Sequence, residues 1–256
     1  MHLERTDSSP VQIKNPVLVI GGFLSTHEDF ERMVHEIRSF FNPVVILLPE
    51  GDFSEVLVKI RGFIESTFSH PIPIIGYSMG GRVALQLLEN FSDLFSHVIC
   101  ISSRLKLDGF ESTKRGEFEK EVRQKLQNLK MDQFLKWWYS LPIFAGYCPS
   151  DSLLKKKAQF DSQSVLRQFQ TLSILNQKTL SFPLKLPVHL IYGERDPLKK
   201  EMEDCLKESL EPIFVHSIEK SGHLVHLEKP SQLAKLLRMV LLPEPFEPMI
   251  PKLSPC

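Results

Sequence analysis

The chain has 256 residues, of which 42% are apolar and 24% are charged, and its formal net charge at pH 7 is +0. This length suits one large domain, or one core with an inserted subdomain. The balanced charge gives no global attraction to nucleic acid or to an anionic membrane surface, so we expect neither as a partner.

The spacing of the cysteines and the length of the apolar runs bear on the cellular compartment of the protein. Cys100, Cys148, Cys205 and Cys256 are widely separated, and none belongs to a C-x-x-C pair. This spacing argues against a zinc site or a redox motif, and isolated thiols suit a reducing compartment. The first seven residues include no apolar stretch, and the longest apolar runs have the length of strands. We therefore expect a cytoplasmic protein without a metal, a cofactor, a signal peptide or a membrane-spanning helix.

Strand and helix patterns alternate along the first part of the chain. Short apolar runs predict buried strands, whereas apolar residues at helical spacing predict amphipathic helices. The predicted strands are 16–20, 44–48, 72–77 and 97–101, and the predicted helices are 27–41, 54–68 with Ser54 as its N-cap, and the run that starts at residue 83. This order predicts a mostly parallel sheet with helices on both faces and right-handed crossovers.

The alternation stops between residues 104 and 181, where no strand-like run occurs. Helical patterns rich in Lys, Gln and Glu fill this part of the chain, at 111–129, 131–139 and 151–175. An all-helical insertion between strands of one sheet is typical of a cap over a site. The strand pattern then resumes at 187–192 and 213–218, and a last helix, 231–242, has Ser231 as its candidate N-cap.

These patterns predict how the chain is divided. We expect residues 1–103 and 182–242 to form an α/β core and residues 104–181 to form a helical cap. Residues 243–256 contain five prolines and no periodicity, which predicts a loosely attached tail.

A G-x-S-x-G motif, Gly76-Tyr77-Ser78-Met79-Gly80, lies between the strand 72–77 and a helical run. In this setting the motif is typical of a nucleophile elbow, a tight turn that exposes the serine at the end of a sheet. Because Gly and Ser are each near 7% of residues in average proteins, the pattern arises by chance in roughly one chain in ten of this length. Partner residues elsewhere in the chain are needed to support a catalytic role for Ser78.

Suitable partners follow in the order that α/β-hydrolases use, first an acid and then a histidine. Asp196 comes directly after the strand 187–192, and His223 follows the strand 213–218. Both therefore lie at carboxyl ends of strands, where open α/β sheets place their sites. A serine needs an adjacent base, and that base needs an orienting carboxylate, so we predict a Ser78–His223–Asp196 triad. Glu194 and His226 are the rival acid and base.

An oxyanion hole requires two backbone N–H groups near the nucleophile. In this fold one comes from the residue after the serine, here Met79, and the other from the loop after the first long strand. That loop is Gly21-Gly22-Phe23, and we predict Phe23 as the second donor.

Four segments together resemble a known family. They are Gly76–Ala84, Trp138–Phe144, Gly193–Asp196 and Gly222–His226. In order and rough spacing, from about residue 16 to residue 242, they are similar to the α/β-hydrolase superfamily, and most of all to MenH, the 2-succinyl-6-hydroxy-2,4-cyclohexadiene-1-carboxylate synthases of the menaquinone pathway. The resemblance implies an α/β-hydrolase fold and a lyase that eliminates pyruvate from an anionic polycarboxylate by proton abstraction.

The resemblance also implies which residues bind the substrate. Arg82 matches the carboxylate-binding arginine beside the nucleophile, and Arg115 matches a cap arginine. Tyr77 and Trp138 match aromatic residues that contact the substrate. From the residues alone, two alternatives stay open: Arg82 as a solvated helix residue, and Trp138 as part of the core of the cap.

Three departures from the MenH pattern bear on the substrate. The chain has Gly21-Gly22 where the family has His-Gly, and the loop at Pro49–Asp52 replaces D-x-P-G-x-G. Only lysines, Lys155–Lys157, occur where a second cap arginine is expected, and lysine lacks the fork geometry of arginine. Two alternatives therefore stay open: an ester or thioester hydrolase that forms a Ser78 acyl-enzyme, and a non-catalytic binding protein with the same fold.

Overall fold

The structure is a computed structural model and describes residues 15–69, 71–105, 109–178, 180, 184–206 and 213–242. The predicted tail at 243–256 lies outside these residues, as does the start of the chain. Among the described residues, no helix combines the length and the apolar character needed to cross a bilayer.

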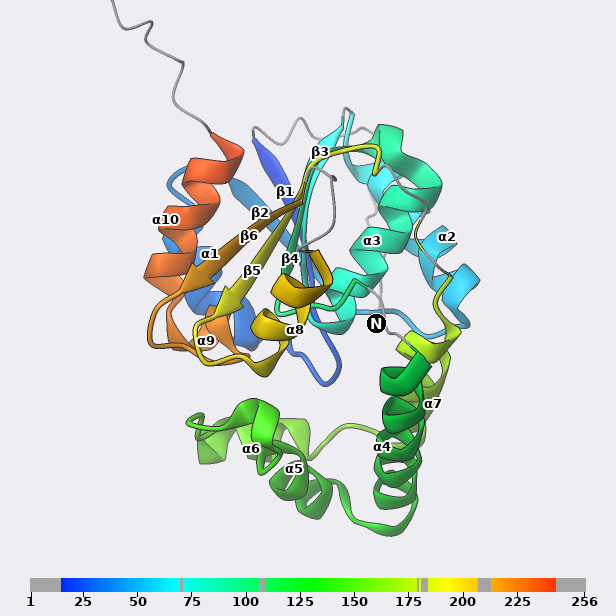
Figure 1. The fold of residues 1–256 in the computed structure, drawn as a ribbon. Coiled ribbons are helices and arrows are strands. Elements are labelled where there is room, and N and C mark those ends of the chain that lie inside the picture. The colour runs from blue at the N-terminus through cyan, green and yellow to red at the C-terminus, as the bar shows by residue number, and fades with distance from the viewer. Residues whose placement is uncertain are drawn as a thin grey trace, which may run out of the picture.

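Six parallel strands form one sheet, as the alternating pattern predicts (Figure 1). The strand order is β2-β1-β3-β4-β5-β6. The strands are β1 (Pro16–Ile20), β2 (Asn42–Ile46), β3 (Ile72–Tyr77), β4 (Phe95–Ile101), β5 (Val188–Gly193) and β6 (Ile213–Ile218). The chain runs outward from β1 to β2 and then returns to the other side of β1, so the order reverses between β1 and β3. A reversal of this kind opens a crevice at the carboxyl ends of the strands, where ligands bind.

Helices cover both faces of the sheet because alternate strand residues point to opposite sides. In β1, Val17 and Val19 are buried in one core and Leu18 and Ile20 in the other. The helices on the Val17 side are α1 (Glu31–Ile37), α9 (Val225–Glu228) and α10 (Pro230–Leu241), and those on the Leu18 side are α2 (Phe53–Thr67), α3 (Met79–Phe91) and α8 (Pro197–Leu206). Figure 1 shows α1 and α10 on one side of the strands and α2 and α3 on the other.

Four further helices, which we call the helical segment, lie together beneath the sheet in the view of Figure 1. They are α4 (Gly109–Asn128), α5 (Met131–Tyr139), α6 (Asp151–Lys157) and α7 (Ser162–Thr171). Short 3-10 turns, η3 (Pro142–Phe144) and η4 (Ile174–Asn176), follow α5 and α7. The predicted division into core and cap agrees with this arrangement in outline and stays a prediction.

The first residues and N-caps of the helices differ most from those predicted from the sequence. The N-cap of α2 is Asp52, not Ser54: its carboxylate accepts a hydrogen bond from Glu55 N, and the Glu55 carboxylate accepts one from Asp52 N. This reciprocal pair satisfies two N–H groups that a serine two residues later would leave free. Likewise, α10 starts at Pro230 with Lys229 as its N-cap, so Ser231 is not the cap.

Two predicted helices are divided in the structure. The stretch 151–175 breaks into α6 and α7 because Asp161 caps a new helix by accepting from Ser164 N. The stretch 27–41 begins with a 3-10 turn, η1 (His27–Phe30), before α1. Neither α8 nor α9 was predicted, and α9 is a single short turn.

Candidate active site

Ser78 occupies a strained turn between β3 and α3. Its φ of 50° and ψ of −110° place it in the left-handed half of backbone space, which side chains other than glycine rarely adopt. The flanking glycines make the turn possible, because a Cβ on Gly76 would lie 2.4 Å from Gly80 O and one on Gly80 would lie 2.4 Å from Ile20 O. Strand and helix therefore approach closely, and the serine projects from the tip.

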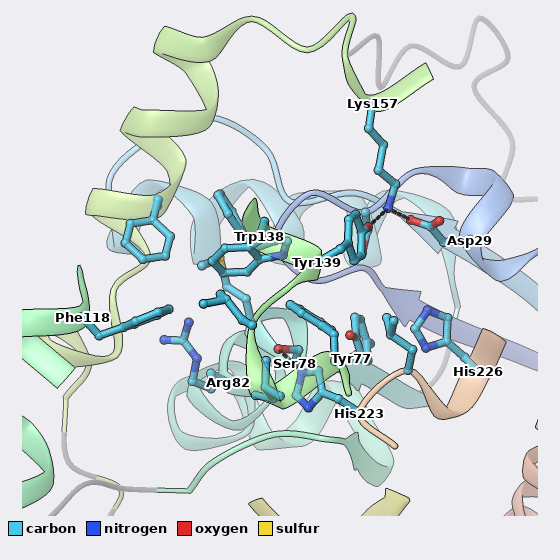
Figure 2. A pocket seen from close by; sticks show the side chains of 18 of the residues that line it. Asp29, Tyr77, Ser78, Arg82, Phe118, Trp138, Tyr139, Lys157, His223 and His226 are labelled. Atoms are coloured by element: carbon cyan, nitrogen blue, oxygen red, sulfur yellow. Dashed lines mark hydrogen bonds and ion pairs between the residues drawn. The ribbon is translucent and has the colours of Figure 1, made fainter. Parts of the chain in front are cut away.

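The structure brings the three predicted triad residues together (Figure 2). His223 Nε2 lies 3.3 Å from Ser78 Oγ, and His223 Nδ1 lies 3.0 Å from Asp196 Oδ2. Leu198 N donates to the second oxygen of Asp196 at 3.0 Å. Asp196 and His223 are each only 3% exposed. This is the geometry in which a serine can pass its proton to a histidine that a carboxylate orients.

The rival acid and base lie elsewhere. Glu194 is exposed and accepts a hydrogen bond from Lys220 N at 2.9 Å. His226 is buried and stacks on Phe30, and no hydrogen bond joins it to Ser78 among the described residues. The choice of Asp196 and His223 over these rivals therefore agrees with the geometry.

Burial and hydrogen bonding act in opposite directions on Asp196. Burial alone would raise the pKa of this carboxyl, but the hydrogen bond and charge of His223 and the hydrogen bond from Leu198 N lower its pKa overall. Asp196 is consequently an anion at neutral pH, which suits a group that orients and stabilises a protonated His223. By contrast, burial lowers the pKa of His226 to about 3, so that its ring is neutral.

Two backbone N–H groups lie where an oxyanion hole is predicted. Among the described residues, no acceptor is found for the N–H of Met79, at the start of α3, or for that of Phe23, in the loop after β1. Both residues line the cavity at Ser78. Ser25 Oγ accepts from Gly22 N at 2.9 Å and so helps to fix the loop that carries Phe23. Their role as donors stays a prediction.

A cavity of about 100 Å³, which we call the catalytic cavity, lies over Ser78. Aromatic side chains from the helical segment form its roof (Figure 2). These are Phe118, Trp138, Tyr139, Phe144 and Phe169. A second cavity of about 70 Å³, also at Ser78 and His223, is lined by Arg82, Arg104 and Arg115. Ser78 therefore lines both cavities, and so do Arg82 and Arg115.

Arg82 is buried in α3, four residues after Ser78, and only 6% of it is exposed. Its Nη1 donates to Leu172 O at 3.0 Å and to Gln177 Oε1 at 3.4 Å, and no carboxylate of the described residues forms an ion pair with it. Burial, with a smaller contribution from Arg115, lowers the pKa of Arg82 to about 9, so it remains a cation at neutral pH. The solvated helix position considered from the sequence is therefore wrong. The charge of Glu119 acts on Arg82 in the opposite direction, but it forms no ion pair with the guanidinium. A buried cation without an ion pair of its own is costly unless a ligand supplies the negative charge.

The other three residues implied by the resemblance also line the catalytic cavity. Tyr77 is buried, and its ring lies 5.7 Å from that of His223. Arg115 pairs with Glu119 at 2.7 Å, so part of its charge is already compensated. Trp138 lines the cavity and also packs against the rings of Phe23 and Phe134, so it contributes to the core of the helical segment as well.

Lys157, from the lysine run, has an unexpected partner. Its Nζ donates to Asp29 Oδ2 at 2.8 Å and to Tyr139 Oη at 2.9 Å, and both members of the ion pair are almost fully buried (Figure 2). Lys157 stands where a second anion-binding arginine was expected, but its charge is compensated within the protein. The same contact joins the helical segment to η1.

Sequence reasoning missed several residues of the cavity wall. Tyr139 and Phe144 belong to the W-Y-x-x-P-x-F motif, which could have indicated them. The sequence around Asp29 gave no such signal, because an acid at this position is typical of the start of a helix. In the structure the Asp29 carboxylate does accept a hydrogen bond from Thr26 N, at 2.8 Å, in addition to its contact with Lys157. Among the described residues, no group of three or more metal-binding side chains occurs.

Comparison with known proteins decides the family. A family model described as alpha/beta hydrolase fold matches residues 49–230. The chain belongs to the alpha/beta hydrolase fold family. It is 24% identical to the 2-succinyl-6-hydroxy-2,4-cyclohexadiene-1-carboxylate synthase of Klebsiella pneumoniae subsp. pneumoniae over 196 residues, which cover 74% of this chain and 76% of the relative.

Solved structures agree with this assignment. MenH from S. aureus superposes with a TM-score of 0.76 at 18% identity, covering 92% of this chain and 96% of that one. A thermophilic esterase from Thermogutta terrifontis reaches a TM-score of 0.67 at 17% identity, with 90% of each chain covered. The predicted fold and the resemblance to MenH are confirmed. The protein is an enzyme of the alpha/beta hydrolase fold that acts on a small molecule.

Proposed function

We propose that the protein is a MenH-like lyase that eliminates pyruvate from an anionic polycarboxylate by means of Ser78, His223 and Asp196. The observation that carries the proposal is the buried guanidinium of Arg82, which lies one helical turn from Ser78 without a carboxylate partner. Arginine binds carboxylates in a bidentate manner, and burial strengthens such a contact. A carboxylate substrate therefore completes the site.

The triad supplies the base for this elimination. As Ser78 Oγ passes its proton to His223 Nε2, it removes a proton from a carbon of the substrate. The electron pair of that C–H bond forms a C=C bond, and the C–O bond to the leaving group breaks and releases pyruvate. His223 gives its proton to the departing enolate of pyruvate, so that Ser78, which keeps the proton from the substrate carbon, and His223 both end as they began. Asp196, which stays ionised, stabilises the protonated imidazole in between. The N–H groups of Phe23 and Met79 would stabilise negative charge that develops on the substrate carbonyl.

A direct test is incubation with the substrate of the 2-succinyl-6-hydroxy-2,4-cyclohexadiene-1-carboxylate synthases, with pyruvate measured by a coupled dehydrogenase. The proposal expects pyruvate and the cyclohexadiene product in equal amounts. Acylation bursts with p-nitrophenyl esters, together with no release of pyruvate, would contradict it.

An ester or thioester hydrolase is the second candidate, because the N–H groups of Phe23 and Met79 would serve it equally well. Two donors without acceptors beside a strained serine suit a tetrahedral intermediate as well as they suit an enolate. The two reactions differ in what Ser78 does: it forms a covalent acyl-enzyme in hydrolysis and only moves a proton in elimination. A covalent adduct on Ser78 with the mass of the acyl group, the alcohol or thiol having left, would favour the hydrolase if it is trapped by rapid quench and found by intact-mass measurement.

A further inference from the structure

The catalytic cavity has two ends that differ in chemistry, one on each side of Ser78 (Figure 2). The first, which we call the arginine end, is lined by Arg82 and Arg115. The second, which we call the polar end, is lined by side chains of α5, α6, α9 and η1. These are Tyr139, Lys157, His226 and Asp29. Because both ends belong to one cavity, a single bound molecule can contact both.

The polar end contains a cation and an anion that compensate each other. Lys157 Nζ donates to Asp29 Oδ2 at 2.8 Å and to Tyr139 Oη at 2.9 Å. The two charged side chains are only 4% and 3% exposed. An ammonium group has three N–H bonds, and these two contacts use two of them. A carboxylate that entered the polar end would therefore meet a lysine whose charge is already balanced.

Two buried polar atoms of the polar end have no hydrogen-bond partner within the part of the chain that the structure describes. They are Asp29 Oδ1 and His226 Nδ1. The other carboxylate oxygen of Asp29, in contrast, accepts from both Thr26 N and Lys157 Nζ. Buried polar atoms of native proteins are nearly always satisfied, because an unpaired one loses its contacts with water without compensation. We therefore expect a bound ligand to supply the missing partners.

A hydroxyl group suits these atoms better than a carboxylate does. A hydroxyl donates one hydrogen bond, which Asp29 Oδ1 can accept, and it can accept another from the remaining N–H of Lys157. A carboxylate only accepts, and its charge has the same sign as that of Asp29. The charge of Asp29 acts within the cavity, since it adds to the effect of burial in raising the pKa of Tyr139. The neutral ring of His226 adds no cation that could offset it.

We propose that the polar end binds a hydroxyl group of the substrate while the arginine end binds its carboxylates. This inference rests on the proposed function and adds to it the substrate class. The substrate is a polycarboxylate that has its carboxylates on one side of the reacting carbon and a hydroxyl on the other. The lysine run, where the sequence departs from the MenH pattern, then has a different role: Lys157 holds Asp29 in place and does not bind an anion.

Three rigid ligands test this without the natural substrate. Isophthalate has two carboxylates on one side of a benzene ring, 5-hydroxyisophthalate adds a hydroxyl at the opposite ring position, and trimesate has a third carboxylate there. Isothermal titration calorimetry measures the Kd of each. We expect 5-hydroxyisophthalate to bind the wild-type protein about 10-fold more tightly than isophthalate, because hydrogen bonds to charged groups are the strong ones. Trimesate should bind about 10-fold more weakly than 5-hydroxyisophthalate, because its third carboxylate meets Asp29.

Asp29→Asn removes the negative charge of the polar end and keeps the size of the side chain. Lys157 then lacks a counter-charge, so trimesate should gain affinity by about 10-fold and bind at least as tightly as 5-hydroxyisophthalate. Glu28→Gln is the matched control, since it makes the same change in the neighbouring acid, which pairs with the exposed Lys156 and does not line the cavity. It should leave the order of the ligands unchanged. The order in the wild-type protein decides the question if Asp29→Asn does not fold.

The possible failures are distinct. Equal affinities for isophthalate and 5-hydroxyisophthalate, or a preference of the wild-type protein for trimesate, would overturn the polar end as a hydroxyl site. Either result would leave the carboxylate site at Arg82, and the proposed function with it, intact. Binding of none of the three ligands would overturn the carboxylate site on which the proposed function depends, and the inference as well.

Discussion

Ser78 and Arg82 are the two residues on which the proposed chemistry depends, and α3 fixes their relation. Ser78 is the N-cap of this helix, Arg82 lies four residues later, and both residues line the two cavities at the nucleophile. The start of α3 therefore places a cation near the nucleophile. The elbow leaves Ser78 strained, and strain of this kind persists only where the surrounding packing enforces it.

Arg82→Ala should lower kcat/KM for a carboxylate substrate at least 10-fold, which corresponds to about 1.4 kcal/mol, the low end for hydrogen bonds to charged groups. Hydrolysis of a neutral p-nitrophenyl ester should change little, since such an ester has no charge for the guanidinium to bind. Steady-state kinetics on both substrates measures the difference.

Gln177→Ala is the matched control for this change. It removes the hydrogen bonds that Gln177 makes with Arg82 and leaves the guanidinium in place. It should preserve most of the activity toward the carboxylate. Equal losses in the two variants would mean that Arg82 only supports the packing around Gln177.

At the scale of elements, two neighbouring ion pairs of different character join α6 to η1. The end of α6 carries both lysines, and η1 carries both acids. Lys156 and Glu28 are about half exposed, whereas Lys157 and Asp29 are almost fully buried. A surface pair contributes little to stability, but breaking a buried pair leaves one charge in the interior without a partner.

Lys157→Met should therefore lower the free energy of unfolding by about 3–5 kcal/mol, because Asp29 would remain buried and unpaired. Lys156→Met, its neighbour in the exposed pair, should cost less than about 1 kcal/mol. Urea denaturation followed by circular dichroism gives both values. In the double variant Lys157→Met/Asp29→Asn, much of the stability should return. If Lys157→Met and Lys156→Met were equally stable, the buried pair would have no structural role.

At the scale of the whole molecule, much of the fold follows from periodicity. Strands β1, β3 and β6 lie where the apolar runs predict them, because buried parallel strands are nearly continuous in apolar residues. The triad was predictable for a related reason: its members directly follow strands, and the sheet brings strand ends together. Helix starts were harder to predict, since Asp52 and Ser54 both suit an N-cap and only backbone geometry selects one.

Contacts between distant segments were not predictable from the chain. Asp29 and Lys157 are 128 residues apart, and neither has a pattern that differs from that of a solvated residue. A groove of about 690 Å³ is formed in the same way, by the loop after β2 and by α7, which lies more than a hundred residues later in the chain. The local sequence pattern of a segment predicts which of its residues are buried. It does not predict which other segment of the chain packs against them.

Stability should fall as the pH falls below about 6.5, and His226 should account for part of the slope. Burial, together with the charges of Lys157 and His223, lowers the pKa of His226 to about 3 in the folded protein, whereas the unfolded chain takes up a proton near 6.5. Between these values the unfolded state binds more protons, so each pH unit of acidification costs about 1 kcal/mol of stability.

His226→Phe should flatten the dependence of the unfolding free energy on pH between 6 and 4.5 by about that amount. The pKa values of His97, His189 and His216 are also lowered by burial, but these residues contribute equally in both proteins. Asp196, whose pKa is lowered from 3.8, begins to contribute only at more acidic pH. Identical slopes in the two proteins would mean that His226 can take up a proton in the folded state.

Pyruvate release by Ser78→Ala, from the substrate of the MenH relatives, tests the central proposal most directly. The proposed mechanism predicts that the wild-type protein releases pyruvate and that the variant loses at least 100-fold in kcat, the lower bound for removing a general base. Ser140→Ala, which changes an exposed serine of the helical segment, should behave as the wild type. Full activity of Ser78→Ala would contradict the account, because the elimination would then proceed without the serine that the elbow holds against His223.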